Sequence, residues 1–325
     1  MKRRDFVLLF GSAAITPRAA LAQATNGRPR LGYLTYATPL AERYRDQFLS
    51  GMRDLGYIEG QNFEMLYRFD DFQPGRMQQV AKELVELKPD VLVGGATRSA
   101  VALKKATDTI PIVIAALAEP VELGLIKSYA RPGGNVTGIM PYVAGLPTKQ
   151  LDLARELVKG ATRIGLLDDV IDPEARPQAE EIMAAGGKLN IMIMPAAVRS
   201  PDDVVQAYEL FSKQSAEVVV VEQSDILLTA RQKIAEAATA MKLPTVYGYH
   251  EHVEAGGLIS YGVNLDWCFR RRAYYVDKIL KGGKPAELPV EFPTSLEMWV
   301  NLKAAKTLGL KISPALLVQA DKIIE

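Results

Sequence analysis

The chain alternates short apolar runs with longer amphipathic segments from about residue 31 to its end. Runs such as 91–93 and 217–221 are rich in β-branched residues, which is typical of strands buried on both faces of a parallel sheet. Between such runs, apolar residues recur three or four positions apart, as at Val80, Leu84 and Leu87, and this spacing predicts helices with one buried face. Strands that alternate with helices through short loops predict a doubly wound α/β fold.

The alternation restarts after about residue 140, so the chain divides into two α/β halves of similar size. A length of 325 residues is enough for two domains, each with its own core. No sequence repeat relates the halves, and the chain has no low-complexity tract. We therefore expect two lobes, each built on a parallel sheet.

The clearest unit is the stretch 109–138, which predicts a strand, a loop, a helix and a second short strand. The loop consists of the small residues 115–118 and follows a β-branched run. The i, i+4, i+8 spacing of Val121, Leu125 and Tyr129 predicts the helix. Ligands of open α/β sheets bind at loops that follow the carboxyl ends of strands, so this loop is a candidate contact.

The first 24 residues predict an export signal. They contain an arginine pair at 3–4, an apolar core at 7–15 that is too short to span a bilayer, and an A-x-A-like cleavage site at 20–22. We expect a cleaved twin-arginine-type signal peptide at 1–24, a periplasmic location and, because no cysteine lies near the cleavage site, no lipid anchor. Cys268 is the only cysteine, which excludes an internal disulfide, and we expect it in the core.

Charge and motifs argue against nucleic-acid binding and against catalysis. The 39 basic and 38 acidic residues give a net charge of +1, and the chain has no G-x-G-x-x-G, Walker loop, G-x-S-x-G or C-x-x-C. The H-E-H sequence at 250–252 lacks the spacing of a helical metal site, so we expect a solvated loop near the cleft. Asp168, Asp169 and Asp172 predict a hydrated loop rather than paired catalytic carboxylates, and the arginines at 270–272 predict a solvated helix face.

Five stretches resemble the substrate-binding proteins of ABC transporters, in the family that includes the tryptophan/tyrosine-binding lipoproteins. The first comprises IPIV (110–113) and, five residues further on, EPVELGLIKSYARPGGNVTG (119–138). The second part is similar to the family pattern DPVxxGLVxSLARPGGNxTG. The others are FLSGMRDLGYIEGQNFEMLYR (48–68), AGGLISYGVN (255–264), RRAYYVDKILKGGKPAELPVE (271–291) and NLKAAKTLGLKISPALLVQADKIIE (301–325). The resemblance covers the whole mature chain and is silent about the ligand.

This resemblance implies the fold of a type I periplasmic binding protein, with the ligand in a cleft between two lobes. It implies that the segment after the last strand of the second half returns to the first lobe, so that a hinge of several crossings joins the lobes. The implied domains are 28–140 plus 262–288 for lobe 1, and 141–261 plus 289–325 for lobe 2.

The candidate ligand contacts lie in loops that follow strands in both halves. The helix expected to start at Arg98 offers free N–H groups to a carboxylate, and the Arg98 side chain either forms a bidentate pair or is solvated. Glu119 stands where the family usually has aspartate, and it either binds a cationic amine or only stabilises a helix N-terminus. Tyrosines either stack on a planar ligand or pack in the core. The full set is Tyr36, Thr38, Gly95, Ala96, Thr97, Arg98, Ala118, Glu119, Asp169, Gln223, Tyr247 and Tyr249.

We expect a periplasmic solute-binding protein that delivers a small organic molecule to an ABC importer. An aromatic or apolar carboxylate or amino acid suits the tyrosines, the glycines and the helix N-terminus. The expected partners are this ligand and an ABC permease in the inner membrane. We expect a monomer that binds no nucleic acid, needs no cofactor or metal and is no enzyme. Two alternatives stay open: a sensory protein that presents its ligand to a membrane receptor, and a periplasmic enzyme that acts on the same ligand.

Overall fold

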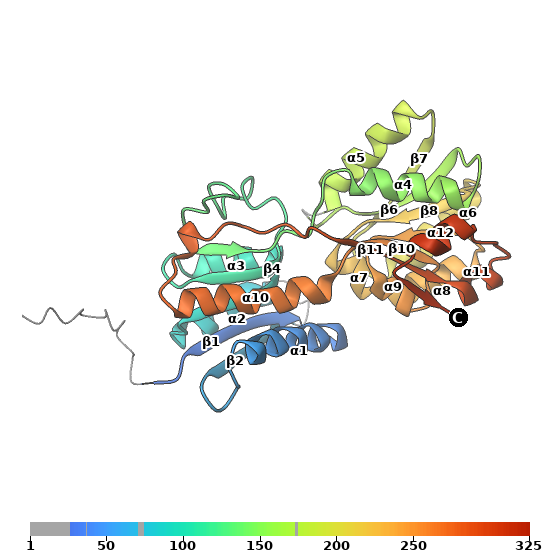
Figure 1. The fold of residues 1–325 in the computed structure, drawn as a ribbon. Coiled ribbons are helices and arrows are strands. Elements are labelled where there is room, and N and C mark those ends of the chain that lie inside the picture. The colour runs from blue at the N-terminus through green and yellow to red at the C-terminus, as the bar shows by residue number, and fades with distance from the viewer. Residues whose placement is uncertain (1–26, 37, 71–74, 173–174) are drawn as a thin grey trace, which may run out of the picture.

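The computed structural model describes residues 27–36, 38–70, 75–172 and 175–325, so the predicted signal peptide lies outside the described residues. The described residues form two α/β lobes that lie side by side (Figure 1). Within this part of the chain, no helix combines the length and the apolar character of a membrane span.

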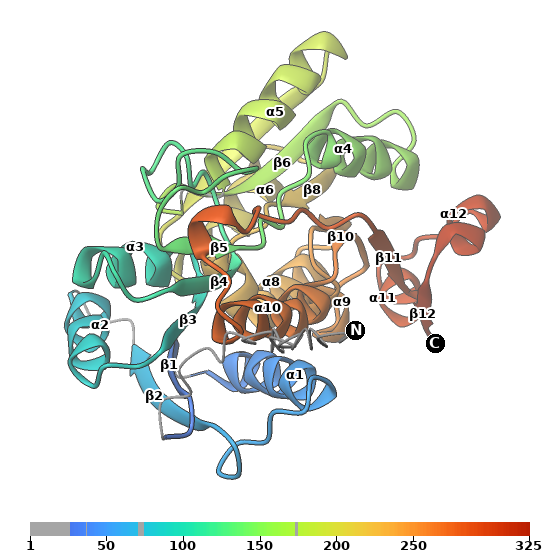
Figure 2. The ribbon, with the colours of Figure 1, turned by 60° about the vertical axis from the view of Figure 1, so that its left-hand side comes forward.

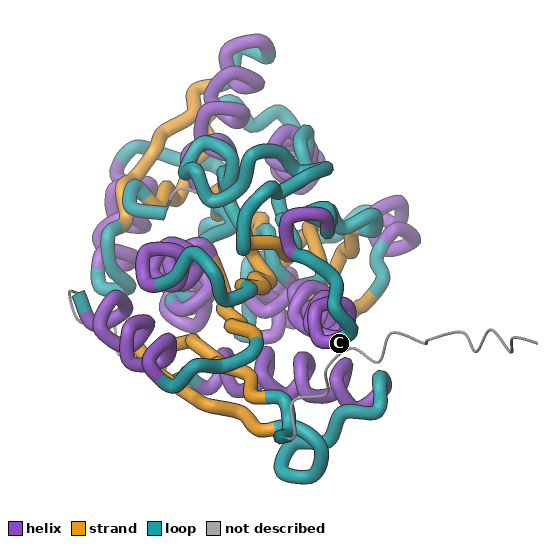
Figure 3. The backbone as a smooth tube through the Cα atoms, turned by 90° about the vertical axis from the view of Figure 1, so that its left-hand side faces the viewer, coloured by secondary structure: helices purple, strands orange, loops and turns teal. Residues whose placement is uncertain are grey.

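The first lobe is built on a five-stranded parallel sheet in the order β2-β1-β3-β4-β5. Its strands are β1 (Arg30–Tyr36), β2 (Glu64–Asp70), β3 (Val91–Ala96), β4 (Ile112–Ala116) and β5 (Val136–Gly138). Its helices are α1 (Pro39–Asp54), α2 (Arg76–Glu86), α3 (Thr97–Ala106) and α10 (Leu265–Leu280). Helices α1 and α10 pack on one face of the sheet and α2 and α3 on the other. Figure 3, coloured by secondary structure, shows helices on both sides of the strands. Cys268 of α10 is fully buried in the core between this helix and the sheet, as predicted.

The second lobe is built on a seven-stranded sheet in the order β12-β11-β10-β9-β8-β6-β7. Its strands are β6 (Arg163–Asp169), β7 (Met192–Val198), β8 (Val218–Val221), β9 (Thr245–Tyr247), β10 (Ile259–Val263), β11 (Leu296–Asn301) and β12 (Lys322–Ile324). Its helices are α4 (Leu146–Leu157), α5 (Ala175–Lys188), α6 (Asp203–Lys213), α7 (Asp225–Thr229), α8 (Arg231–Ala240), α9 (His250–Glu254), α11 (Leu302–Thr307) and α12 (Pro314–Gln319). All its pairings are parallel except β10 with β11, and helices cover both faces. The predicted class of two doubly wound lobes is confirmed.

Three segments join the lobes: β5 to α4, β10 to α10, and the segment after the 3₁₀ helix η1 (Pro285–Glu287) to β11 (Figures 1 and 2). The first and third run side by side, because Glu291 N–H donates to Gly138 O at 3.0 Å and Met140 N–H donates to Glu291 O at 2.9 Å. Gly138 has a φ of +149°, and a Cβ atom there would lie 2.1 Å from Ile114 O. Only glycine therefore fits where the first crossing leaves the sheet.

The helix predicted from Val121 to Tyr129 is wrong, because this segment is a series of turns. Glu119 and Gly124 have φ values of +43° and +67°, which lie outside the helical region. Leu125 N–H bonds back to Pro120 O at 2.8 Å, so the chain folds on itself instead of propagating a helix. Leu125 is buried, whereas Val121 is 39% exposed, so the apolar spacing does not mark one buried face.

The predicted solvated face at 270–272 is wrong for Arg272. Arg270 reaches Ser50 and Asp54 at the surface, and Arg271 Nε lies 2.8 Å from Glu291 Oε2. Arg272 is fully buried on the side of α10 that faces the sheet. Three consecutive helical residues point in different directions, so one of them faces the core.

Candidate functional site

A pocket with a cavity volume of about 50 Å³ lies between the two lobes, at the carboxyl ends of β1 and β3. It is lined by Thr35, Tyr36, Thr38, Leu40, Ala41, Tyr44, Gly95, Ala96, Asp225, Leu228, Thr229 and Phe269. Adjacent parallel strands end at the same edge of a sheet, so the pairing of Leu34 with Gly94 brings the loops after β1 and β3 together. Helix α7 closes the pocket from the second lobe, so a molecule in it touches both lobes.

The apolar side of the pocket is an aromatic wall formed by Tyr44 of α1 and Phe269 of α10. Their rings stack with centroids 4.0 Å apart and planes 10° apart. Leu228 and Tyr249 of the second lobe belong to the same buried cluster, which therefore spans both lobes. Such a wall suits a planar or apolar group.

The polar end of the pocket is Asp225, the first residue of α7. The helix begins there because the Ser224 side chain accepts a hydrogen bond from Leu227 N–H at 3.2 Å. The Tyr36 hydroxyl donates to Asp225 Oδ2 across the lobes at 3.4 Å. Burial and then the Asp172 carboxylate raise the pKa of Asp225 to about 7, although the Arg98 guanidinium opposes them. A cationic ligand group beside Asp225 would therefore stabilise its ionised form and bind to it favourably.

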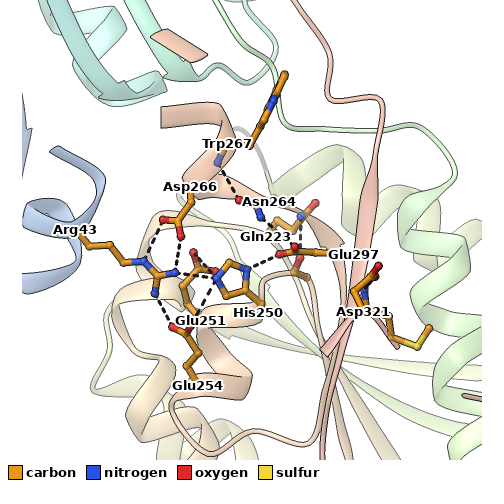
Figure 4. Close-up of polar contacts among 12 residues, drawn as sticks. Arg43, Gln223, His250, Glu251, Glu254, Asn264, Asp266, Trp267, Glu297 and Asp321 are labelled. Atoms are coloured by element: carbon orange, nitrogen blue, oxygen red, sulfur yellow. Dashed lines mark hydrogen bonds and ion pairs between the residues drawn. The ribbon is translucent and has the colours of Figure 1, made fainter. Parts of the chain in front are cut away.

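Beside the pocket, charged and hydrogen-bonding side chains connect α1 of the first lobe to α9 and β11 of the second (Figure 4). We call this set the interlobe joint: Arg43, Tyr44, His250, Glu251, Glu254, Asp266 and Glu297. Arg43 Nη1 lies 2.5 Å from Glu254 Oε2, and its Nη2 lies 2.6 Å from Asp266 Oδ2 and 3.1 Å from His250 Nε2. The Tyr44 hydroxyl donates to Glu251 Oε1 at 2.7 Å. The joint fixes how α1 sits on the second lobe.

The prediction of a solvated loop at 250–252 is wrong, because these residues form most of α9 and are buried. His250 Nδ1 lies 2.6 Å from Glu297 Oε1. Burial opposes protonation of His250, but the Glu297 hydrogen bond and the Glu251 and Glu254 carboxylates raise its pKa above the usual value. His252 stacks on Tyr247, and burial lowers its pKa to about 4. Among the described residues, no group of three or more His, Cys, Asp or Glu side chains is arranged to hold a metal ion.

The pocket contains four of the predicted site residues: Tyr36, Thr38, Gly95 and Ala96. Arg98 is exposed, and its guanidinium lies 5.9 Å from the centre of the Tyr36 ring, at the border of the pocket.

Three further predicted residues support the loops of the first lobe. The Thr97 hydroxyl accepts a hydrogen bond from Ala118 N–H at 2.7 Å, and both residues are buried. Glu119 lies in the loop that follows, and burial and then Glu122 raise its pKa. None of the three lines the pocket.

The predicted residues of the second lobe lie away from the pocket lining. Asp169 Oδ1 accepts hydrogen bonds from two backbone N–H groups, including that of Asp172 at 3.1 Å; both side chains are buried, so the predicted hydrated loop is wrong for them. Gln223 N–H donates to the Gln178 side chain at 2.8 Å. Tyr247 lies in the core of the lobe, and Tyr249 lies in the cluster behind the aromatic wall.

Eight lining residues escaped the sequence reasoning: Thr35, Leu40, Ala41, Tyr44, Asp225, Leu228, Thr229 and Phe269. Tyr44 and Phe269 lie more than one helical turn inside α1 and α10, so a search of strand-end loops passed over them. Asp225 carried a usable signal, because it lies four residues after the end of β8 and directly after the capping Ser224.

Comparison with known proteins adds a family to this geometry. The model of the ABC transporter substrate binding protein family matches residues 38–324. The chain belongs to this family. Two solved structures are similar to it in fold: the ABC domain in complex with L-Trp from Streptococcus pneumonia (TM-score 0.85, 24% identity, 92% of this chain and 100% of that one), and a conserved domain protein from Vibrio cholerae (TM-score 0.86, 28% identity, 91% of this chain and 100% of that one).

A curated relative is similar over most of its length. The Tyrosine-binding protein of Clostridioides difficile (strain R20291) is 24% identical over 273 residues, which are 84% of this chain and 78% of that protein. The predicted family resemblance is confirmed, and with it the two-lobed fold of type I periplasmic binding proteins.

Proposed function

We propose that this substrate-binding protein holds an aromatic or apolar α-amino acid in the pocket between its lobes. The observation that carries the proposal is the lining of the pocket: an aromatic wall, a carboxylate at Asp225, and the backbone of Gly95 and Ala96 with Arg98 beside it. The wall suits the side chain of the ligand, Asp225 its ammonium, and the glycine-rich backbone with Arg98 its carboxylate. The L-Trp complex and the Tyrosine-binding protein support this class of ligand.

The ligand would act by bridging the lobes. A ligand shifts an equilibrium between open and closed forms only by its difference in affinity for the two. A pocket with Tyr36 on one lobe and Asp225 on the other offers contacts that exist together only when the lobes approach. We propose that the closed form delivers the amino acid, chemically unchanged, to an ABC permease in the inner membrane.

The proposal extends to export and assembly. The arginine pair at 3–4 and the apolar segment after it support export to the periplasm by the twin-arginine route, with cleavage of 1–24. The protein would work as a monomer with lobes 28–140 plus 262–288 and 141–261 plus 289–325.

A thermal-shift screen of the mature chain tests the proposal. The protein is unfolded and refolded to remove a carried ligand and is then mixed with amino acids, aromatic acids lacking an amine, sugars and purines. A ligand at a hundred times its Kd adds ~2.7 kcal/mol of stability. We expect a shift of several degrees with aromatic or apolar amino acids only. A shift with sugars or purines alone would contradict the proposal.

A further inference from the structure

Arg272 is a buried cation without a carboxylate partner in the described part of the chain. Its side chain is fully buried, and no ion pair joins it to a described acidic residue. Burial lowers the pKa of the guanidinium, but arginine remains protonated in proteins. A lone buried charge is costly, so its surroundings must compensate it.

The compensation comes from carbonyl oxygens and aromatic faces. Arg272 Nη1 donates to Gly94 O at 2.8 Å, Nη2 to the Tyr33 hydroxyl at 3.2 Å, and Nε to Phe269 O at 3.3 Å. The guanidinium carbon lies 4.5 Å from the centre of the Phe269 ring, and the Tyr33 and Phe48 rings lie 5.3 and 5.1 Å away. These contacts hold the cation in place but leave its net charge unbalanced.

Two of these partners connect Arg272 to the pocket. Gly94 directly precedes Gly95 and Ala96, whose backbone lines the pocket. Phe269 is half of the aromatic wall and stacks on Tyr44. Arg272 therefore supports two walls of the pocket from behind without lining it.

We propose that Arg272 is a positioning residue that fixes the Gly94–Ala96 backbone and the aromatic wall, and that its unbalanced charge makes the pocket prefer a ligand with a carboxylate. Charges buried in protein are weakly screened, so a ligand anion near Gly95 supplies the negative charge that the chain does not. Asp225 faces the pocket from the second lobe, so the ligand is oriented with its carboxylate toward the first lobe and its ammonium toward the second. The carboxylate preference rests on the proposed function; the positioning role does not.

Hydrogen–deuterium exchange of the ligand-free protein tests the positioning role. The variants are Arg272→Met, Arg272→Lys and the matched control Arg270→Met, which removes an arginine from the surface of the same helix. We expect about tenfold faster exchange of backbone amides at 94–99 in Arg272→Met, because Gly94 O loses its buried donor. Arg272→Lys should also exchange faster, since an ammonium cannot reproduce the planar fork that reaches Gly94 and Tyr33 together. Unchanged exchange in a folded Arg272 variant would overturn the positioning role.

Calorimetric titration with L-tyrosine and with tyramine, which lacks the carboxylate, tests the charge. The ratio of the tyramine Kd to the L-tyrosine Kd should fall about tenfold in Arg272→Met and stay within twofold in Arg270→Met and Arg272→Lys, which keep the buried charge. An equal loss of affinity for both probes would overturn the carboxylate preference. If the wild type binds neither probe, the proposed function fails, while the exchange experiment still decides the positioning role.

Discussion

The interlobe joint contains a buried hydrogen bond whose contribution to stability is open to direct measurement. Tyr44 and Glu251 are 5% and 1% exposed, and the hydroxyl lies 2.7 Å from Glu251 Oε1. Glu251 Oε2 has no hydrogen-bond partner in the described structure, so the Tyr44 hydroxyl is the main donor to this carboxylate. Tyr44→Phe keeps the ring stacked on Phe269 and removes only the donor.

A hydrogen bond to a charged, buried group contributes about 1.5–3 kcal/mol. We therefore expect Tyr44→Phe to lower the free energy of unfolding by about 2 kcal/mol in urea denaturation of the ligand-free protein. The matched control is Tyr67→Phe, which removes a hydroxyl at 2.9 Å from the exposed carboxylate of Glu59. There water replaces the lost partner, so the loss should stay below about 0.5 kcal/mol.

The loss should also depend on pH. Burial raises the pKa of Glu251, although His250 and the Tyr44 hydrogen bond oppose it, so removing the hydroxyl raises this pKa further. A carboxyl with a raised folded pKa binds more protons when folded, so stability falls as pH rises from its unfolded pKa through its folded pKa. The deficit of Tyr44→Phe should therefore be larger at about pH 8 than at about pH 5. A loss equal to that of Tyr67→Phe, or a deficit that does not change with pH, would refute this account of the joint.

Three further predictions address the joint, the pocket and the crossing. Because folding raises the pKa of His250, its contribution to folding stability is complete below its unfolded pKa and is lost as pH rises through its folded pKa. Urea denaturation across this range should show that the free energy of unfolding declines with pH in the wild type but not in His250→Gln. Asp225→Asn should bind an amino acid about tenfold more weakly than the wild type at about pH 8. Calorimetry should show that the affinity of the wild type rises as pH passes about 7, where Asp225 ionises, and that the affinity of the variant does not. Gly138→Ala places a Cβ 2.1 Å from Ile114 O and should lower the free energy of unfolding, measured by thermal denaturation, by about 3 kcal/mol. Gly282 also has a positive φ, but no atom would contact a Cβ there, so Gly282→Ala should lower it by only about 1 kcal/mol.

Most of the fold was predictable because strands and helices of the two sheets carry strong local patterns. A β-branched run such as 218–221 is buried on both faces, and its composition alone marks it as a strand. The segment after Glu119 shows the limit of this reasoning. Val121 and Leu125 have helical spacing, but the positive φ at Gly124 and the bond from Leu125 N–H to Pro120 O produce turns.

The site was only partly predictable because its decisive contacts join residues far apart in the chain. Tyr36 and Gly95 were predicted because they lie at the ends of β1 and β3, and strand ends can be recognised from the local sequence. His250 looked solvated by composition, yet it is buried because Arg43, 207 positions away, and Glu297 satisfy its two nitrogens. Arg272 looked solvated for the same reason, and only the packing of α10 on the sheet reveals that it is buried.

Gly95 allows the most direct test of the central claim that the pocket between the lobes binds the ligand. A Cβ atom at Gly95 would meet only Thr35 Oγ1, at 3.8 Å, so Gly95→Leu fills the pocket without backbone strain. Gly187→Leu is the matched control, because it adds the same side chain to α5 where no atom lies within 4 Å. We would titrate wild type and both variants calorimetrically with L-tyrosine and L-tryptophan. The account predicts one site per chain with micromolar affinity, about 8 kcal/mol, in the wild type and Gly187→Leu, and at least a hundredfold loss in Gly95→Leu. Undiminished binding by a folded Gly95→Leu would contradict it.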